Sequence, residues 1–461
     1  MNFSSSDRPI DTENIVSQGV NAMNAGRFED ALSFFSSVES QLYSHPALQL
    51  NIGICHYHLG NLVNAQHYLE AACSLAPGLE EVQNALGAIL IAKGDLSAAL
   101  ATFKFALNMH PNSAMLLSNI GLTYKELGSH DEAEDSLRRA LKIAPNDSAA
   151  HNNLALVLLS KGKYREAWAH HVYRTHNGNA KTIASIQQLS TQIIGKDMCL
   201  VGEQGIGDEL FFLRYAPLIK KVAGKIRLIT NPKLGRILAE CGIFDNIYTD
   251  STPSTHSEIT IFVGDLPLLL QTSVSLFPPP LTIATNPNAI LSQRTRLGDT
   301  FGHPIIGLTW RAGPVKSTYS SVKLQKSIPL DNAFSALPEN CVVVILQRFI
   351  LQSEIDYILN HSGTRRVVFA SDVNDDLTQA AALLSQLDDY VTVSNTLLHL
   401  HAGLGKRAHV LIPYPYEWRW AQPGDSPWFP TCLTYKQLPD GDWSKTIFHL
   451  RDDLKRIYES Y

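Results

Sequence analysis

A 34-residue repeat constrains the first third of this chain more than any other feature of the sequence. Five glycines are 34 residues apart, and an alanine follows each of them by five residues. Two antiparallel helices can cross closely where small residues meet, while glycine turns the chain and proline ends a helix. The turn glycines are Gly26, Gly60, Gly94, Gly128 and Gly162. The period predicts an α-solenoid of five helix pairs over residues 12–175, preceded by a disordered N-terminus over residues 1–11.

The pattern resembles the tetratricopeptide repeat, whose stacked units present a concave groove that holds a peptide. Asparagines recur near the same repeat position in this chain, and their amides can donate to and accept from a peptide backbone. This ladder resembles the one in the tetratricopeptide arm of O-linked N-acetylglucosamine transferases. Asparagine is also common at this repeat position without any binding role, so both interpretations stay open. The candidate peptide-binding residues are Asn51, Asn84, Asn119 and Asn153.

Charge and hydropathy exclude several classes of partner. The 461 residues carry 38 Lys+Arg against 43 Asp+Glu, a net charge of −5, which is a poor match for a nucleic-acid backbone. No apolar run approaches the roughly 18 residues that a membrane-spanning helix needs. The N-terminus lacks the pattern of a secretory signal, so the expected location is the cytoplasm. The six cysteines have no metal-ligand or redox spacing, and we expect them to be reduced.

The remaining chain predicts an α/β unit. A polar linker over residues 176–195 precedes short apolar runs that alternate with helical patterns, which is typical of parallel sheets. A loop-rich stretch near residues 277–304 separates two such series. We therefore predict two Rossmann-like halves, over residues 196–300 and 301–461. Ligands of such sheets bind beyond the carboxyl ends of the strands.

The first candidate site is the glycine-rich turn Gly202-Glu-Gln-Gly-Ile-Gly-Asp-Glu209. Its spacing is not that of an NAD site, and no ribose-binding acid follows the second strand. Asp208 stands on the first turn of the next helix, where the helix N-terminus favours an ionised carboxylate that could accept a proton. The alternative is that Asp208 only caps that helix.

The second candidate site follows the strand that ends at Val393. Ser394 could cap the helix, so that the backbone amides of the next residues would cradle a diphosphate. Two cations, Arg311 and Lys326, could neutralise it, although each could equally be a solvated surface residue. The amide-bearing residues are Asn395, Thr396 and Leu397, and His399 falls on the same side of the helix.

These segments together resemble bacterial tetratricopeptide-containing glycosyltransferases related to the heptosyltransferases. The resemblance rests on the glycine-rich turn with Phe211-Phe-Leu-Arg-Tyr215, on Gly307-Leu-Thr-Trp-Arg-Ala-Gly313, Lys326-Ser-Ile-Pro-Leu330 and Val393-Ser-Asn-Thr396, and on Glu417-Trp-Arg-Trp420 with Asp425-Ser-Pro-Trp-Phe-Pro430. It implies a GT-B fold and inverting sugar transfer without metal or cofactor, the nucleotide sugar being a substrate.

The resemblance also implies roles for single residues. Asp208 takes the position of the catalytic aspartate, with Gln204 and Gly205 on the acceptor side. Lys326 matches a phosphate-binding lysine, and residues 394–399 match the loop that binds the donor diphosphate. Gln347 and Asp372 lie where nucleoside contacts are expected. The acceptor implied is a protein recruited by the repeats, such as flagellin.

The sequence departs from the family in ways that keep two alternatives open. Ser394-Asn395 stands where some members have Asp-Thr, Gln379-Ala380 replaces another Asp-Thr pair, and the first half looks shortened after Val263. One alternative is a non-catalytic adaptor with a degenerate transferase unit. The other is a heptosyl-type transferase that acts on a saccharide.

Overall fold

The structure is a computed structural model that describes residues 12–175, 178, 180–250, 257–270, 277–300, 302–313 and 326–458. The predicted disordered N-terminus lies outside the described residues. Two compact units divide the described chain between residues 150 and 151. The described residues contain no helix both long and apolar enough to cross a membrane, and the six cysteines are free thiols.

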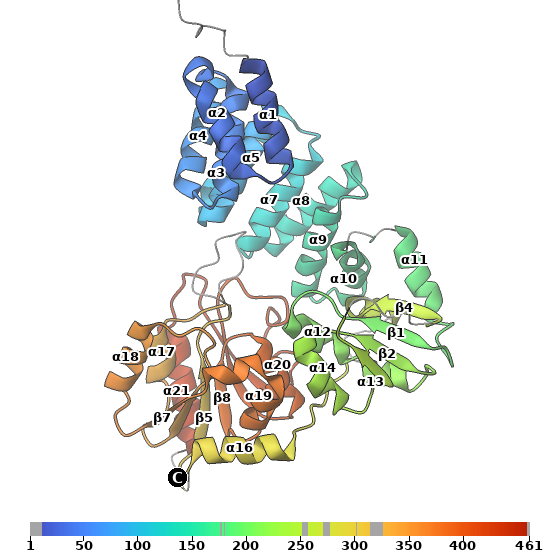
Figure 1. The fold of residues 1–461 in the computed structure, drawn as a ribbon, viewed down its shortest axis with the longest axis vertical. Coiled ribbons are helices and arrows are strands. Elements are labelled where there is room, and N and C mark those ends of the chain that lie inside the picture. The colour runs from blue at the N-terminus through green and yellow to red at the C-terminus, as the bar shows by residue number, and fades with distance from the viewer. Residues whose placement is uncertain are drawn as a thin grey trace, which may run out of the picture. The chain divides into compact units, whose positions relative to one another are not determined.

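The first unit consists of antiparallel helix pairs, as the repeat predicts (Figure 1). The helices are α1 (Thr12–Asn24), α2 (Phe28–Leu42), α3 (Pro46–His58), α4 (Leu62–Leu75), α5 (Glu80–Lys93), α6 (Leu96–Met109), α7 (Ala114–Glu126) and α8 (His130–Ile143). Each of the five turn glycines is left-handed, with φ between +73° at Gly162 and +84° at Gly94. Only glycine adopts such a φ without steric cost, which explains its period.

A second series of glycines lets paired helices cross closely. A Cβ on Gly53 would lie 2.7 Å from Leu69, and a Cβ on Gly121 would lie 2.5 Å from Leu137. A Cβ on Gly87 would overlap the ring of Phe103, which is fully buried. The glycine and its partner both recur with the repeat, so the period specifies the helix crossing as well as the turn.

The second unit begins within α9 (Ser148–Ser160). The helix α10 (Tyr164–His171), second of the fifth pair, belongs to the α/β unit: Tyr164 packs edge-on against Trp428 with ring centroids 5.2 Å apart, and Trp168 packs against Phe212 at 6.1 Å. The turn η1 (Val172–Arg174) and α11 (Ala180–Leu189) follow, so the segment that we assigned as a linker contains a helix.

The first sheet of this unit is parallel, with strand order β3-β2-β1-β4. Its strands are β1 (Met198–Val201), β2 (Ile226–Ile229), β3 (Asn246–Tyr248) and β4 (Ile259–Phe262). Its helices are α12 (Ile206–Leu213), α13 (Ala216–Lys220), α14 (Pro232–Ala239) and α15 (Leu266–Leu269), with η2 (Val263–Asp265). The strand β3 was not predicted, because three residues are too few for a hydrophobic alternation.

The second sheet is also parallel, with strand order β10-β9-β8-β5-β6-β7. Its strands are β5 (Ile305–Thr309), β6 (Val342–Ile345), β7 (Arg366–Phe369), β8 (Asp389–Thr392), β9 (Ala408–Ile412) and β10 (Cys432–Lys436). Its helices are α16 (Pro287–Leu297), α17 (Leu330–Ser335), α18 (Gln352–Asn360), α19 (Leu377–Leu384), α20 (Thr396–Gly403) and α21 (Ser444–Tyr458), with η4 (Ser371–Asp375). This is the strand order of Rossmann sheets. The chain adds strands first on one side of β5 and then on the other, so the order reverses between β5 and β8 while all strands stay parallel.

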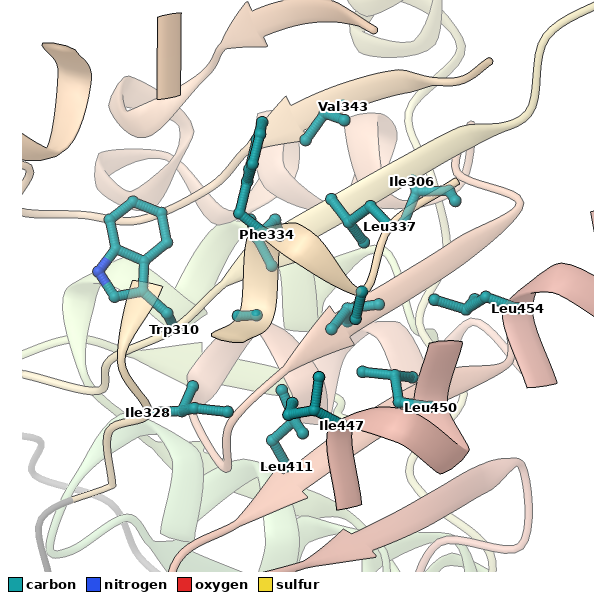
Figure 2. Close-up of a cluster of buried hydrophobic side chains, with 14 of the residues drawn as sticks. Ile306, Trp310, Ile328, Phe334, Leu337, Val343, Leu411, Ile447, Leu450 and Leu454 are labelled. Carbon is teal, nitrogen blue, oxygen red and sulfur yellow. The ribbon is translucent and has the colours of Figure 1, made fainter. Parts of the chain in front are cut away.

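The core of the second sheet packs α17 and α21 against the strands. Figure 2 shows Phe334 and Leu337 beside Ile306 and Val343, with Leu450 of α21 in the same cluster. All five are buried. Burial of such side chains contributes roughly 1.5–3 kcal/mol each, and this holds the strand ends in place.

Candidate functional site

The glycine-rich turn after β1 fits its sequence closely. A Cβ on Gly202 would overlap the carboxylate of Glu209, which is buried beneath the turn and bonded to Thr230. Gln204 adopts a left-handed φ of 62°, unusual for a residue other than glycine, and its side chain is exposed. Gly205 is the N-cap of α12, which places Asp208 on the first turn as predicted.

The turn after β8 differs from the prediction by one residue. Asn395, not Ser394, is the N-cap of α20: its Oδ1 accepts from the Leu398 amide at 2.9 Å and its Nδ2 donates to Thr392 Oγ1 at 2.9 Å. Asn395 therefore braces the strand end against the helix. The amides of Thr396 and Leu397 belong to the first turn, where the N–H groups of any helix have no acceptor within the helix.

The N-termini of α12 and α20 approach each other. A Cβ on Gly207 would lie 3.4 Å from His399 Cδ2 and 3.7 Å from Thr396 Oγ1. A helix N-terminus carries partial positive charge, so two that converge favour an anion between them. Asp208 lies on the first turn of one of these two helices, α12.

A chain of ion pairs, centred on the buried Arg419 and Glu417, connects the predicted residues. Asp208 Oδ1 accepts from Arg419 at 2.5 Å, and Arg419 also pairs with Glu417. The other oxygen of Glu417 accepts from Lys326 at 2.8 Å and from Ser394 Oγ at 3.0 Å. The structure thus brings together Asp208, Lys326 and Ser394, and it pairs each of them with a partner from this same unit.

The pKa values of two buried groups at this site, Glu417 and His399, are both lowered. Although burial opposes it, the positive charges of Lys326 and Arg419 hold the pKa of Glu417 well below its usual value. Burial, with Arg419 and Arg214 nearby, pushes the pKa of His399 well below its usual value, so that its ring is neutral. His399 packs edge-on against Phe429, with ring centroids 5.2 Å apart.

Two buried arginines contact one phenyl ring. The guanidinium carbons of Arg214 and Arg419 lie 4.1 Å and 4.4 Å from the centroid of Phe211. Arg214 donates to the carbonyls of Phe211 and Trp428, both at 2.9 Å, and burial lowers its pKa to about 9. Ring faces stabilise these cations where water cannot reach.

The sequence motifs contain Glu417, Arg419 and Arg214, but we predicted no role for them. Charges flanked by tryptophans, as in Glu417-Trp-Arg-Trp420, are a signal that could have identified a buried pair.

Three predicted donor-binding residues lie outside this chain of ion pairs. Arg311 pairs with Glu354 at 2.6 Å, and Asp372 pairs with Arg296 at 2.6 Å. Gln347 accepts from the Arg311 amide at 3.0 Å and donates to the Arg311 carbonyl at 3.0 Å, so it braces the end of β5.

The asparagines of the repeats lie on the first helix of their pairs. Asn51 is on α3, Asn84 on α5 and Asn119 on α7, and the Asn119 amide donates to Asn84 Oδ1 at 2.5 Å. Asn153, on α9, falls in the second unit. All four are half-buried.

Among the described residues, no three His, Cys, Asp or Glu side chains gather where they could hold a metal ion.

Comparisons with known proteins identify the repeats. Tetratricopeptide-repeat models match residues 16–80, 78–146 and 136–169. The chain is 28% identical over 143 residues to the anaphase-promoting complex subunit cut9 of Schizosaccharomyces pombe, covering 30% of this chain and 21% of cut9. It is 30% identical over 114 residues to the peroxisomal targeting signal receptor of Eremothecium gossypii, covering 25% of this chain and 20% of the receptor.

A longer match extends beyond the repeats. The chain is 21% identical over 419 residues to protein FlbA of Caulobacter vibrioides, covering 84% of this chain and 69% of that protein. Among solved structures, TTC0263 of Thermus thermophilus, a tetratricopeptide protein, is 26% identical, with a TM-score of 0.32 over 34% of this chain and 87% of that one. The chain therefore carries tetratricopeptide repeats followed by a unit with two parallel sheets.

Proposed function

We propose that this protein is an adaptor that binds an extended peptide through its repeats and whose α/β unit does not catalyse sugar transfer. One observation carries the second half of the proposal: the carboxylate that would accept a proton, that of Asp208, is already bonded through Oδ1 to Arg419 at 2.5 Å. Lys326 is likewise engaged by Glu417, and Arg311 by Glu354. Such internal pairing stabilises the fold, and it occupies one of the two Asp208 oxygens that an acceptor hydroxyl could reach.

The first half of the proposal rests on the repeats. The first helices of neighbouring pairs, α3, α5 and α7, contact one another in sequence and form a continuous inner surface. The amides of Asn84 and Asn119 meet on that surface. Their bond uses one donor hydrogen and one acceptor, which leaves further donor and acceptor sites for the backbone of an extended peptide.

We expect Asn119→Ala to weaken peptide binding about 3- to 10-fold, the worth of one net hydrogen bond. The measurement is fluorescence polarisation of a labelled extended peptide, selected from a random library against the full chain. Asn108→Ala is the matched control, because Asn108 is an exposed asparagine on α6, the second helix of its pair. Equal affinities for the two variants would refute the role of the asparagine surface.

A second candidate function is the inverting glycosyltransferase of GT-B type, and the convergence of α12 and α20 beside Asp208 favours it. Asp208 would take the proton of an acceptor hydroxyl on a protein or saccharide. The hydroxyl oxygen would attack the anomeric carbon of a nucleotide sugar, and the diphosphate would leave toward Lys326 and the first amides of α20. Because Asp208 Oδ1 is bonded to Arg419, the basic oxygen in this reaction would be Oδ2.

The two candidates predict different results for Asp208→Asn. For the adaptor we expect no sugar transfer by parent or variant, and no thermal stabilisation by a panel of nucleoside diphosphates. For the transferase, the parent would transfer sugar and the variant would lose about 100-fold or more. Asp245→Asn is the matched control, because Asp245 pairs with Lys220 and is 35% exposed, against 37% for Asp208.

A further inference from the structure

The second sheet ends in two edge strands, β10 on one side and β7 on the other. Figure 1 shows β7 on the side of the sheet where α17 and α18 lie. The edge of β10 is closed by its own chain. The Cys432 amide donates to the Phe429 carbonyl at 3.0 Å, and the Thr434 amide donates to Asp425 Oδ1 at 3.3 Å. These bonds occupy groups that another strand beside β10 would need.

The edge of β7 has no such cover. The amides of Arg366 and Ala370 donate to carbonyls of residues 341–345, at 3.1 Å and 2.9 Å, so the even-numbered residues of β7 bond to its neighbour β6. The N–H and C=O groups of Val367 and Phe369 therefore point away from the sheet. Among the residues that the structure describes, none bonds to these outward groups. The strand thus offers two donors and two acceptors to another strand.

The side chains beside this edge are apolar. Val367 and Phe369 lie on the same face of the sheet, because side chains alternate along a strand. Val367 packs against the core cluster that includes Ile358 of α18, whereas Phe369 is 37% exposed. Eight large apolar side chains are exposed in the described part of the second unit, and half of them belong to residues 349–369. An exposed apolar edge of this kind is a site for pairing with another chain.

The edge is complementary to a second copy of itself. In an antiparallel pair centred on Val368, Val367 of each copy stands opposite Phe369 of the other, and all the outward groups of both strands are bonded. The two valine–phenylalanine pairs lie on one face and combine a β-branched with an aromatic side chain, which stabilises a sheet. Arg366 falls opposite Ala370 of the other copy, so no like charges face each other across the pair.

A second copy suits this edge better than a free peptide. The outward groups of only two residues are available, and a peptide would have to be ordered to bond with them. The β7 strand of a second copy is already extended. A second copy also brings its own exposed apolar side chains from the same segment, which are Phe349, Leu351, Leu359 and Phe369.

We infer that two copies of this chain associate through antiparallel pairing of their β7 strands, about a two-fold axis at Val368. The two six-stranded sheets then continue into one. Because the edge of β10 is closed, association stops at two copies. The inference goes beyond the proposed function, since β7 holds no residue of the chain of ion pairs at the candidate functional site.

The test is sedimentation velocity of the full chain over a series of concentrations, where we expect a reversible equilibrium between a 50.9 kDa monomer and its dimer. Phe369→Lys places an ammonium beside Val367 of the other copy. It should weaken the dimer about tenfold or more, because the two-fold axis makes each substitution act twice. Phe448→Lys is the matched control, because Phe448 lies on α21 and is 66% exposed. Monomer at every concentration, assemblies larger than a dimer, or equal effects of the two variants would each overturn the inference.

A cysteine on the axis tests the register. Val368→Cys changes the side-chain volume little and places two thiols opposite each other, with Cα atoms about 4.5 Å apart, which a disulfide can bridge. We expect mild oxidation to convert this variant into a covalent dimer on a non-reducing gel. Phe448→Cys is the control, and the parent chain gives the background from its six free thiols. No more cross-linking in Val368→Cys than in Phe448→Cys would overturn the inference.

Discussion

Replacing Arg419 by methionine is expected to lower the free energy of unfolding of the second unit by about 3–5 kcal/mol, as for other broken buried ion pairs. Arg419 and Glu417 have side chains only 6% and 9% exposed, and Arg419 also contacts the faces of Phe211 and Trp418. Without Arg419, Glu417 keeps Lys326 as its one remaining cation from the described residues. A buried carboxylate with half of its neutralising charge removed destabilises the fold.

Tryptophan fluorescence isolates this effect. All six tryptophans of the chain, at positions 168, 310, 418, 420, 428 and 443, belong to the second unit, so urea unfolding followed by fluorescence reports on that unit. Asp208→Asn is the control, because it removes the half-exposed partner of Arg419 and should cost less than about 1 kcal/mol. Adding Glu417→Gln to Arg419→Met should restore part of the loss. A cost for Arg419→Met as small as that of Asp208→Asn would show that the ion-pair chain contributes little.

Replacing Gly87 by valine is expected to destabilise the repeats by about 3 kcal/mol, because even its Cβ would overlap the Phe103 ring. Phe103 is fully buried between Ala99, Ala106 and Leu116, so it cannot move aside without disturbing its neighbours. The branched side chain also loses rotamer freedom in a helix.

The matched substitution is Gly78→Val, where a Cβ would meet only the flexible end of Met109, at 3.1 Å. Far-UV circular dichroism during urea unfolding measures the stability of both variants. Because all tryptophans belong to the second unit, an unfolding transition that is seen by circular dichroism but not by tryptophan fluorescence is that of the first unit. In a Phe103→Val background the ring is absent, and the cost of Gly87→Val should shrink by the energy of the overlap. An equal loss of unfolding free energy for Gly87→Val in the parent and in the Phe103→Val background would show that Gly87 is not needed to make room for the Phe103 ring.

The sequence predicted the repeats well because each of their features is local and recurs. A glycine such as Gly94 is needed for a left-handed turn, and the next turn glycine is 34 residues away in either direction. The alternation of apolar runs likewise predicted both parallel sheets, but not the short strand β3 or the strand β10. The segment of β10 follows a turn-rich aromatic stretch, where no helix separates it from its neighbour β9.

The candidate site was less predictable, because its contacts are long-range. The position of Asp208 on a helix N-terminus followed from the glycine-rich turn, but its partner Arg419 lies 211 residues further along the chain. Ser394 and Asn395 are both good capping residues, so residue type alone could not decide between them. Arg311 had the charge for a phosphate, and only the fold shows that Glu354 engages it.

The division of the chain within α9 has a consequence for how such proteins can be rearranged in evolution. The helix α10 carries the sequence signature of a repeat, yet it supplies Tyr164 and Trp168 to the aromatic core of the α/β unit. A gene fusion that exchanged whole repeats at the end of the sequence pattern would remove these two side chains and expose Trp428. A recombination point upstream of His151 keeps that core intact. The genetic unit of exchange is thus shorter than the repeat array by one helix pair.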